Sequence, residues 1–214
     1  MRQFLNRLFM LIVGLALYGL GIVVTIQANI GYEPWDIFHV GLAKTTGLSI
    51  GTISILVGLL LVISVALLGE KLGLGTFLNM IMVGLFVDLF MNIGLIPLAG
   101  NFFLGTCMLL AGLFTIALAT YFYIKSAFGA GPRDNLMVVL ARRTGLPVGV
   151  CRGGVELIVT IAGWALGGMV GVGTVISVIV IGYFIQLVFR LFKFDIIAVK
   201  HETLGETLAS LKSK

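Results

Sequence analysis

The sequence GYEPWD at residues 31–36 returns 98 residues later as GAGPRD at residues 129–134. At the same offset, GLGT at residues 73–76 returns as GVGT at residues 171–174. A composition rich in Gly, Leu and Val inflates chance matches, but it does not place two unrelated motifs at one fixed offset. The sequence therefore predicts an internal duplication.

The composition favours a protein embedded in lipid. Of the 214 residues, 59% are hydrophobic and only 11% are charged, whereas a soluble domain carries about 25% charged residues to cover its surface. The net charge of +5 is also compatible with a nucleic-acid-binding protein, but a bilayer explains the placement of the basic residues better. We therefore expect the lipid bilayer as a partner and no nucleic acid.

The duplication divides the chain into two halves. Residues 28–88 align with residues 126–186 without a gap, and 21 of these 61 positions are identical. We expect a first membrane repeat over residues 1–97, a second over residues 98–194, and a short cytoplasmic tail over residues 195–214.

Each half contains three stretches long enough to cross the hydrocarbon core, which takes about 20 residues. Between the first two stretches of each half lies a shorter segment, Pro34–Thr46 or Pro132–Thr144. As a helix, such a segment reaches about 20 Å, which is too short to cross. Proline at its first position and aspartate two residues later favour a helix start. We expect either an interfacial helix or a half-helix dipping into the protein. The predicted spans are residues 8–28, 50–68, 74–91, 103–124, 148–166 and 172–189.

The lysines and arginines decide the orientation. With six crossings and a cytoplasmic N-terminus, 13 of the 14 basic residues lie inside and only Lys44 lies outside, as the positive-inside rule predicts. Because each half crosses three times, the second half enters the membrane inverted. The predicted fold is all-α and polytopic: six transmembrane helices in two inverted three-helix repeats, each with an extra short half-helix, and both termini cytoplasmic. The residues counted inside are Arg2, Arg7, Lys71, Lys125, Arg133, Arg142, Arg143, Arg152, Arg190, Lys193, Lys200, Lys212 and Lys214.

The same motifs resemble those of a known group. The sequence is similar to the YczE/YyaS/YitT family of bacterial integral membrane proteins, and we expect the YczE-like branch, because residues 195–214 do not resemble the soluble C-terminal domain of the YitT kind. The resemblance implies a multi-pass protein of the bacterial cytoplasmic membrane, and it carries over no catalytic residue. It rests on Gly31, Pro34, Trp35, Asp36, Gly75, Thr76, Asn79, Gly84, Asp88, Arg152, Glu156 and the motifs at residues 129–134 and 171–174.

Two aspartates start the short segments. Asp36 follows Pro34, Asp134 follows Pro132, and Arg133 accompanies only the second copy. The aspartates could bind a cation or proton, or gate access by pairing with a basic residue. Alternatively, they only stabilise helix N-termini by accepting from free backbone N–H groups.

A further carboxylate, Asp88, falls inside the third predicted span. Such a group costs at least about 2.5–3.5 kcal/mol in a bilayer, so it usually faces the protein interior or a wet cavity. Asn79 lies nine residues earlier, on the opposite helix face, and Gln186 is the repeat counterpart of Asp88. A binding role and a structural hydrogen bond to a neighbouring helix both remain open.

Arg152 and Glu156 are four residues apart on the fifth predicted span, where they can form an ion pair. Their counterparts are Ser54 and Gly58, so the charges occur in the second half only. The pair is either structural or a gate that opens when the bridge breaks.

The remaining motifs suggest no cofactor chemistry. Trp35, near a membrane edge, fits an aromatic belt or a platform for a substrate. His39 and His201 have no neighbouring ligands, and GVGT lacks the lysine of a phosphate loop. We expect no metal and no cofactor.

These observations favour a transporter for an unknown small molecule or ion, either as a single chain or as a half-transporter that works as a homodimer. Inverted repeats with paired helix breaks are a recurrent transporter plan. The alternative is a non-transporting membrane factor that supports assembly or regulation of a partner protein. An intramembrane enzyme is disfavoured, because the sequence lacks the His-x-x-x-His, Gly-x-Ser-x-Gly and paired-aspartate motifs.

Overall fold

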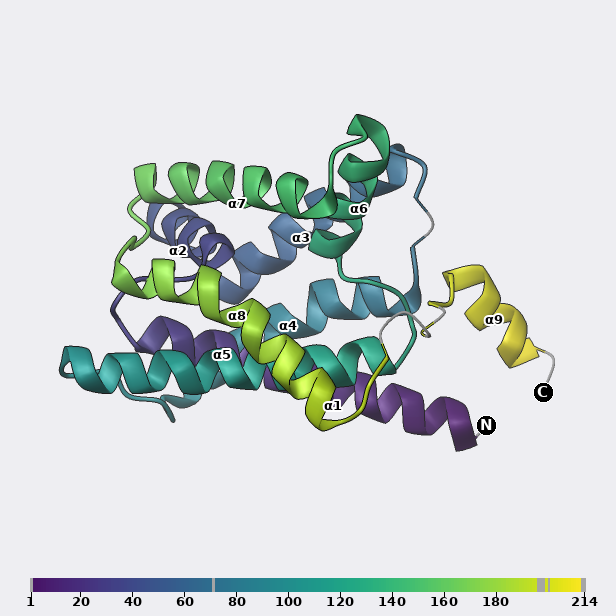
Figure 1. Ribbon diagram of the computed structural model, residues 1–214, viewed down its shortest axis with the longest axis horizontal. Helices are drawn as coiled ribbons and strands as arrows, with labels where there is room; N and C mark the ends of the chain where they lie inside the picture. The colour runs from purple at the N-terminus through teal and green to yellow at the C-terminus, as the bar shows by residue number, and fades with distance from the viewer. Residues whose placement is uncertain (1, 71, 196–198, 200, 213–214) are drawn as a thin grey trace.

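The computed structural model describes residues 2–70, 72–195, 199 and 201–212; Lys71, Lys200 and Lys214 of the charge count lie outside these residues. Within the described part, the chain forms helices and no strand. The helices are α1 (Arg2–Gln27), α2 (Pro34–Thr46), α3 (Ile50–Leu67), α4 (Leu74–Ile93), α5 (Phe102–Lys125), α6 (Pro132–Thr144), α7 (Val148–Ala165), α8 (Val172–Leu191) and α9 (Leu204–Lys212) (Figure 1).

The helices confirm the predicted all-α, multi-pass class. Six of those described, α1, α3, α4, α5, α7 and α8, are long and apolar enough to cross a membrane. The short helices α2 and α6 begin and end at the predicted residues. α1 starts at Arg2, ahead of the expected residue 8, because helical hydrogen bonding continues through the polar residues before the apolar run. The tail contains one more helix, α9.

The short helices are delimited by their end residues. Each has proline in its first turn, where the missing N–H group needs no partner. Each ends at a glycine with a left-handed backbone, Gly47 with φ 75° and Gly145 with φ 71°. This conformation stops the helix, because side chains rarely tolerate it. The chain then turns directly into α3 or α7.

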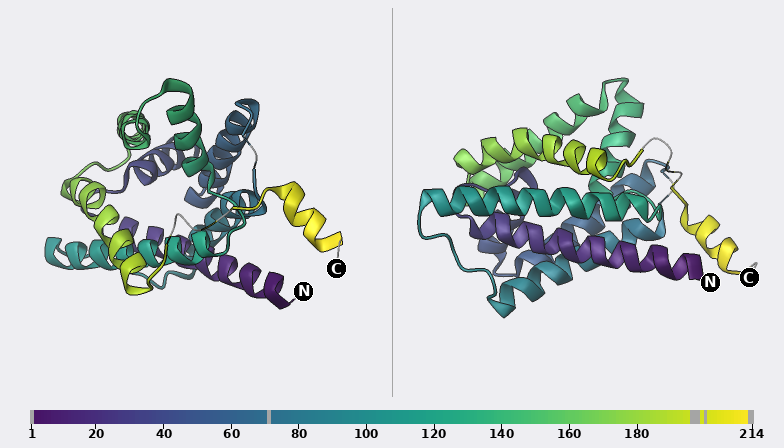
Figure 2. Two further views of the ribbon diagram at one scale, coloured as in Figure 1. Left: turned by 45° about the vertical axis from the view of Figure 1, so that its right-hand side comes forward. Right: turned by 60° about the horizontal axis from the view of Figure 1, so that its bottom comes forward.

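The spans are arranged around a central pair. α1 and α5 pack along each other, with α4 against α1 and α8 against α5. Above this layer, α2 packs on α7 and α6 on α3, so each short helix contacts a span from the other half of the chain (Figures 1 and 2). The main apolar core lies where α1, α4 and α5 meet, around Leu11, Leu15, Val87 and Ile116.

Two reciprocal contacts join the halves. The backbone N–H of Gly173 donates to the carbonyl of Ile30 (2.8 Å), and that of Gly75 donates to the carbonyl of Phe128 (2.7 Å). These two bonds are related by the offset of 98 residues. At Gly31, φ is +118° and a side chain would meet the backbone of Gly171 at 2.7 Å, so glycine is required there. We call the connection before each short helix its elbow: residues 28–33 before α2 and residues 126–131 before α6. Each elbow therefore packs on the glycine turn of the other half, residues 171–173 or residues 73–75.

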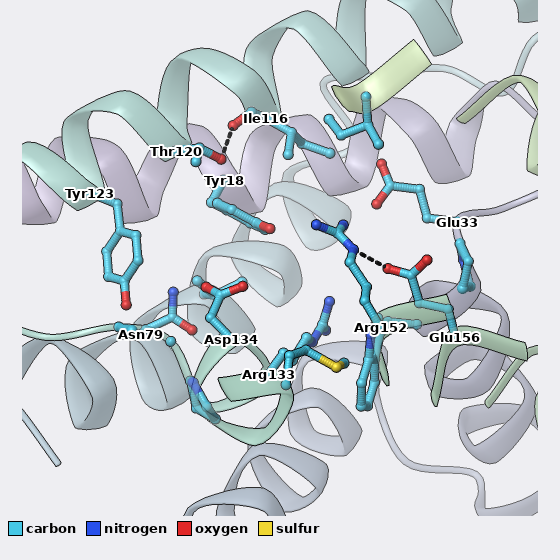
Figure 3. Close-up of a pocket in the computed structure, with 18 of the residues that line it drawn as sticks. Tyr18, Glu33, Asn79, Ile116, Thr120, Tyr123, Arg133, Asp134, Arg152 and Glu156 are labelled. Carbon is cyan, nitrogen blue, oxygen red and sulfur yellow. Dashed lines mark hydrogen bonds and ion pairs between the residues drawn. The ribbon is translucent and has the colours of Figure 1, made fainter. Parts of the chain in front are cut away.

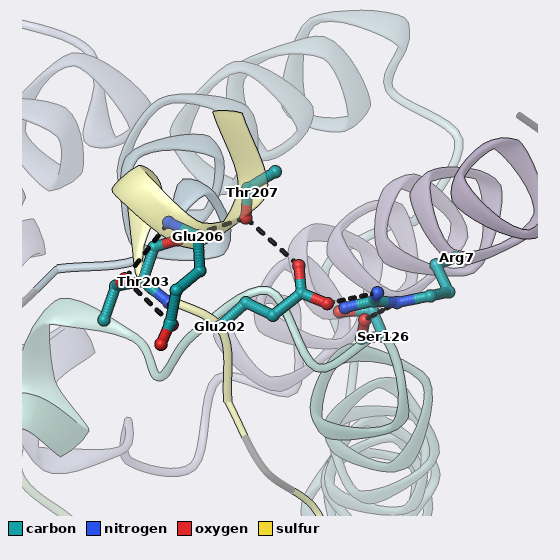
Figure 4. Close-up of polar contacts among 6 residues, drawn as sticks. All are labelled: Arg7, Ser126, Glu202, Thr203, Glu206 and Thr207. Carbon is teal, nitrogen blue, oxygen red and sulfur yellow. Dashed lines mark hydrogen bonds and ion pairs between the residues drawn. The ribbon is translucent and has the colours of Figure 1, made fainter. Parts of the chain in front are cut away.

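The tail is hydrogen-bonded to the elbow before α6. The N–H of Glu202 donates to the carbonyl of Ala127 (2.9 Å), and its carboxylate pairs with Arg7 of α1 (2.6 Å) and accepts from Thr207 (3.2 Å). The Arg7 Nε also donates to the carbonyl of Ser126 (2.9 Å) (Figure 4). These contacts hold the tail beside the entrance to α6.

Candidate functional site

A cavity of about 730 Å³ lies among the helices. Its wall combines apolar side chains with an unusual number of polar and charged ones for a lipid-embedded bundle. Figure 3 shows the polar members Tyr18, Glu33, Asn79, Thr120, Tyr123, Arg133, Asp134, Arg152 and Glu156, which come from α1, α4, α5, α6, α7 and the connection before α2. Polar residues from the remaining elements also line the cavity: His39 of α2, Ser54 of α3, Ser177 of α8 and His201 of the tail.

Most of the residues predicted for the site meet in this cavity. Arg133 and Asp134 come from the start of α6, and Arg152 and Glu156 come from α7. The supporting residues Pro34, Trp35, Asn79 and Pro132 also line it. Asp36, Asp88 and Gln186 do not appear among the lining residues. The structure therefore brings together eight of the eleven predicted side chains, through four different helices.

Arg152 and Glu156 form the predicted ion pair. Arg152 Nε lies 2.7 Å from Glu156 Oε1, one helical turn further along α7. The arginine side chain extends into the cavity toward Tyr18 and Glu33 (Figure 3). Its charge is compensated by Glu156, while the arginine side chain as a whole stays 52% exposed. The ion pair thus lowers the free-energy cost of placing an arginine at the cavity wall. The other N–H groups of the guanidinium can still donate to a ligand.

At the other side of the cavity, Arg133 and Asp134 diverge. The Arg133 guanidinium lies 4.8 Å from the centre of the Trp35 ring, a cation–π contact. Asp134 points toward Tyr18, Tyr123 and Asn79 (Figure 3). Trp35 is buried at the cavity wall, where its ring is in contact with Arg133.

Three groups of cavity-lining residues are buried without a hydrogen-bond partner among the described residues: the Tyr123 hydroxyl, Glu33 Oε1 and His39 Nε2. Tyr123 is 3% exposed. Glu33 lies in the connection between α1 and α2, outside the six candidate spans. Burial, together with the nearby Asp36 carboxylate, raises the pKa of Glu33 to about 8. Buried polar groups without partners are uncommon, so all three side chains are available to a bound solute or water.

Sequence reasoning did not select Tyr18, Glu33 or Tyr123. Glu33 carries a usable signal, because it is a carboxylate directly before the proline that starts α2. The tyrosines carry none, since each lies in a span where an aromatic residue is ordinary. Their position in the cavity depends on how α1 and α5 pack.

Asp36 is buried behind the cavity wall. It is 1% exposed, and its Oδ2 has no hydrogen-bond partner in the described part of the chain. His39 Nδ1 lies 3.9 Å from Asp36 Oδ1. Burial lowers the pKa of His39 and raises that of Asp36 to about 6, so His39 is neutral at pH 7 and the two do not form an ion pair of opposite charges.

Asp88 has the structural hydrogen bonds that were one of its two predicted roles. Its carboxylate accepts from the Ser49 hydroxyl (2.5 Å) and from the backbone N–H of Gly51 (2.8 Å). It thereby joins α4 to the first turn of α3, where free N–H groups need acceptors. Gln186, its counterpart on α8, is exposed.

The cavity wall is built from positions related by the repeat offset. Ser54 and Arg152 both line it, as do Gly58 and Glu156, and several other such pairs. In both pairs the residue of the second half, Arg152 or Glu156, is charged, whereas the residue of the first half, Ser54 or Gly58, is uncharged. At these two positions the charges therefore come from α7 only, and the matching positions of α3 are small and neutral.

Comparisons with known proteins place the chain among uncharacterised membrane proteins. Residues 5–190 match a family of unknown function, DUF6198. The chain is 33% identical over 175 residues to the uncharacterized membrane protein YczE of Bacillus subtilis (strain 168), covering 81% of this chain and 80% of YczE. It is 34% identical over 185 residues to an uncharacterized protein of Haemophilus influenzae, covering 85% and 84% of the two chains. It is 28% identical over 171 residues to YyaS of Bacillus subtilis, covering 78% and 84%. No solved structure matches the chain.

Proposed function

The chain belongs to DUF6198, a family of unknown function, and on that premise we propose that it is a membrane transporter for a small polar solute. The observation that carries the proposal is the cavity of about 730 Å³, lined by charged side chains within a bundle of apolar helices. Ionisable residues inside a membrane protein are costly, and they usually mark a substrate or ion pathway. The proposal assigns the protein no catalytic step.

The size and chemistry of the cavity favour an organic solute over a bare ion. Pockets of about 300–1,000 Å³ suit small organic molecules, whereas an ion needs only a few close ligands. Among the described residues, no group of three or more His, Cys, Asp or Glu side chains is placed to hold a metal. Carboxylates and guanidinium groups face the same cavity, so a solute with both donors and acceptors fits best.

The repeat supports the same proposal. The two reciprocal elbow contacts and the paired lining positions follow the offset of 98 residues. Two inverted three-helix repeats, each with a half-helix whose N-terminus faces a shared central cavity, account for both. In secondary transporters, substrate sites lie at such a repeat interface near the bilayer midplane. With the predicted charge orientation, both termini are cytoplasmic.

Uptake by the purified protein in proteoliposomes tests the proposal. The vesicles are offered labelled amino acids, organic cations, organic anions and sugars, and uptake is compared with vesicles that lack protein. We expect saturable uptake of at least one polar class. Folded protein that moves none of them contradicts the proposal and favours the alternative, a non-transporting factor that binds a partner protein.

A matched pair of tyrosine variants links the uptake to the cavity. Tyr123→Phe removes the buried hydroxyl, and Tyr183→Phe removes an equivalent group from an exposed residue outside the cavity wall. A neutral hydrogen bond contributes about 0.5–1.5 kcal/mol, so we expect the affinity for the solute to fall about two- to tenfold in Tyr123→Phe only. Equal behaviour of the two variants contradicts this cavity as the binding site.

A further inference from the structure

The two halves differ in how their second and third spans pack against each other. In the first half, α3 packs along α4, and Gly51 and Gly84 lie in direct contact there. A methyl group at either glycine would overlap the carbonyl oxygen of the other. Asp88 closes the same junction by accepting from Ser49 and Gly51. Neither Gly51 nor Gly84 lines the cavity, so the cavity ends before this junction.

The counterparts 98 residues later are apart. Gly149 of α7 and Gly182 of α8 both line the cavity, and a side chain on either would meet no described atom within 4 Å. α7 packs on α2 and has no comparable packing on α8, two helices that the structure describes throughout. The first turn of α7 has no side-chain cap among the described residues, and Gln186, the counterpart of Asp88, is exposed. The cavity therefore extends between α7 and α8.

We propose that these two junctions are alternating gates of the cavity. The Gly51–Gly84 junction, latched by Asp88, is the exterior gate and is closed in this structure. The Gly149–Gly182 junction is the cytoplasmic gate and is open; it closes when α7 moves onto α8 and Gln186 accepts from the N–H of Gly149. This inference rests on the proposed transport function and on the predicted orientation.

The residues at the two latches explain which gate is open. Asp88 supplies a charged acceptor, and hydrogen bonds to ionised groups are roughly twice as strong as neutral ones. Gln186 supplies only a neutral carbonyl. Ser49 adds a second hydrogen bond to Asp88, whereas its counterpart Pro147 has no hydroxyl. The cytoplasmic gate thus has one weaker bond where the exterior gate has two stronger ones.

Cysteine crosslinking tests closure of the cytoplasmic gate directly. In a background with Cys107→Ala and Cys151→Ala, the pair Gly149→Cys with Gly182→Cys is oxidised in membranes. We expect crosslinks that increase several-fold when Pro147→Ser and Gln186→Asp copy the exterior latch into this gate. The control pair, Gly154→Cys with Gly182→Cys, uses another α7 glycine in open space, on a different face of the helix. Crosslinking no greater than that of the control, with or without the copied latch, overturns the proposal.

Labelling of a cavity cysteine tests the exterior gate. Gly153 lines the cavity and has room for a side chain, so Gly153→Cys can be labelled with a membrane-impermeant maleimide in right-side-out and inside-out vesicles. We expect labelling from the cytoplasmic side only, and additional labelling from the exterior in Asp88→Ala. Equal labelling from both sides without Asp88→Ala, or no change with it, overturns the gate assignment.

Neither measurement needs a known solute. Gated labelling without uptake of any solute would therefore count against transport while leaving the two gates in place. Uptake with crosslinks at the control level would leave transport in place and remove the gates.

Discussion

Charged residues in the cavity are concentrated on the second half of the chain. At the positions of Arg152 and Glu156 the first half has Ser54 and Gly58. Because Arg152 and Glu156 lie four residues apart on α7, the arginine reaches the cavity already paired with a carboxylate. The uneven distribution of charge along the cavity wall means that the cavity can orient a solute.

Replacing Arg152 should impair the site far more than the fold. An i,i+4 pair with an exposed partner contributes about 0.3–0.5 kcal/mol to stability. In Arg152→Gln we expect thermal unfolding close to that of the wild type, but uptake reduced tenfold or more, because the cavity loses one of its two guanidinium groups and Glu156 is left without its cationic partner. Arg190→Gln, at an exposed arginine of α8 outside the cavity wall, is the control. Uptake reduced to the same extent in both variants would show that the effect is not specific to the cavity.

At the scale of elements, the short helices depend on glycine elbows. Gly31 has a positive φ and touches the backbone of Gly171, and Gly129 has the equivalent contact with Gly73. These contacts, rather than the composition of the short helices, position Trp35 and Arg133 at the cavity. The backbone conformation of Gly31 and Gly129 therefore determines where the first residues of α2 and α6 lie relative to the cavity.

A comparison of two glycines separates packing from backbone strain. Gly47 also has a positive φ but no described neighbour within 4 Å. Gly47→Ala carries only the cost of the left-handed backbone, about 1–2 kcal/mol. Gly31→Ala adds overpacking of about 1–3 kcal/mol. We expect the lower melting temperature in Gly31→Ala, measured in detergent; equal values in the two variants would show that the elbow contact does not stabilise the fold.

For the whole molecule, the orientation of the two halves is the property to measure. The exposed residues Thr46 and Thr144 end the two short helices and are 98 residues apart. If the halves are inverted, the positive-inside arrangement places Thr46 at the exterior and Thr144 in the cytoplasm.

Site-directed labelling can decide this. Thr46→Cys and Thr144→Cys are made in a background without Cys107 and Cys151, and intact cells are treated with an impermeant maleimide. We expect Thr46→Cys to react in intact cells and Thr144→Cys only after permeabilisation. Reaction of both cysteines from the same side would remove the inverted repeat and, with it, the assignment of the two gates.

The sequence alone determined the helical elements with good accuracy. Spans follow from apolar length, and the ends of α2 and α6 follow from Pro34, Gly47, Pro132 and Gly145, because each of these residues acts on its own backbone. Arg152 and Glu156 were likewise found, since a pair within one helix needs no knowledge of the fold.

Only the tertiary structure decided which helices meet. The packing of α2 on α7, the presence of Tyr18 and Tyr123 in the cavity, and the position of Asp88 at a closed junction rather than in the cavity all depend on contacts between distant segments. The open and closed junctions show this most clearly. Gly51 with Gly84 and Gly149 with Gly182 are equivalent in sequence, but identical glycines permit close packing without requiring it. Whether two such helices touch is determined by the hydrogen bonds and neighbours that the rest of the fold supplies.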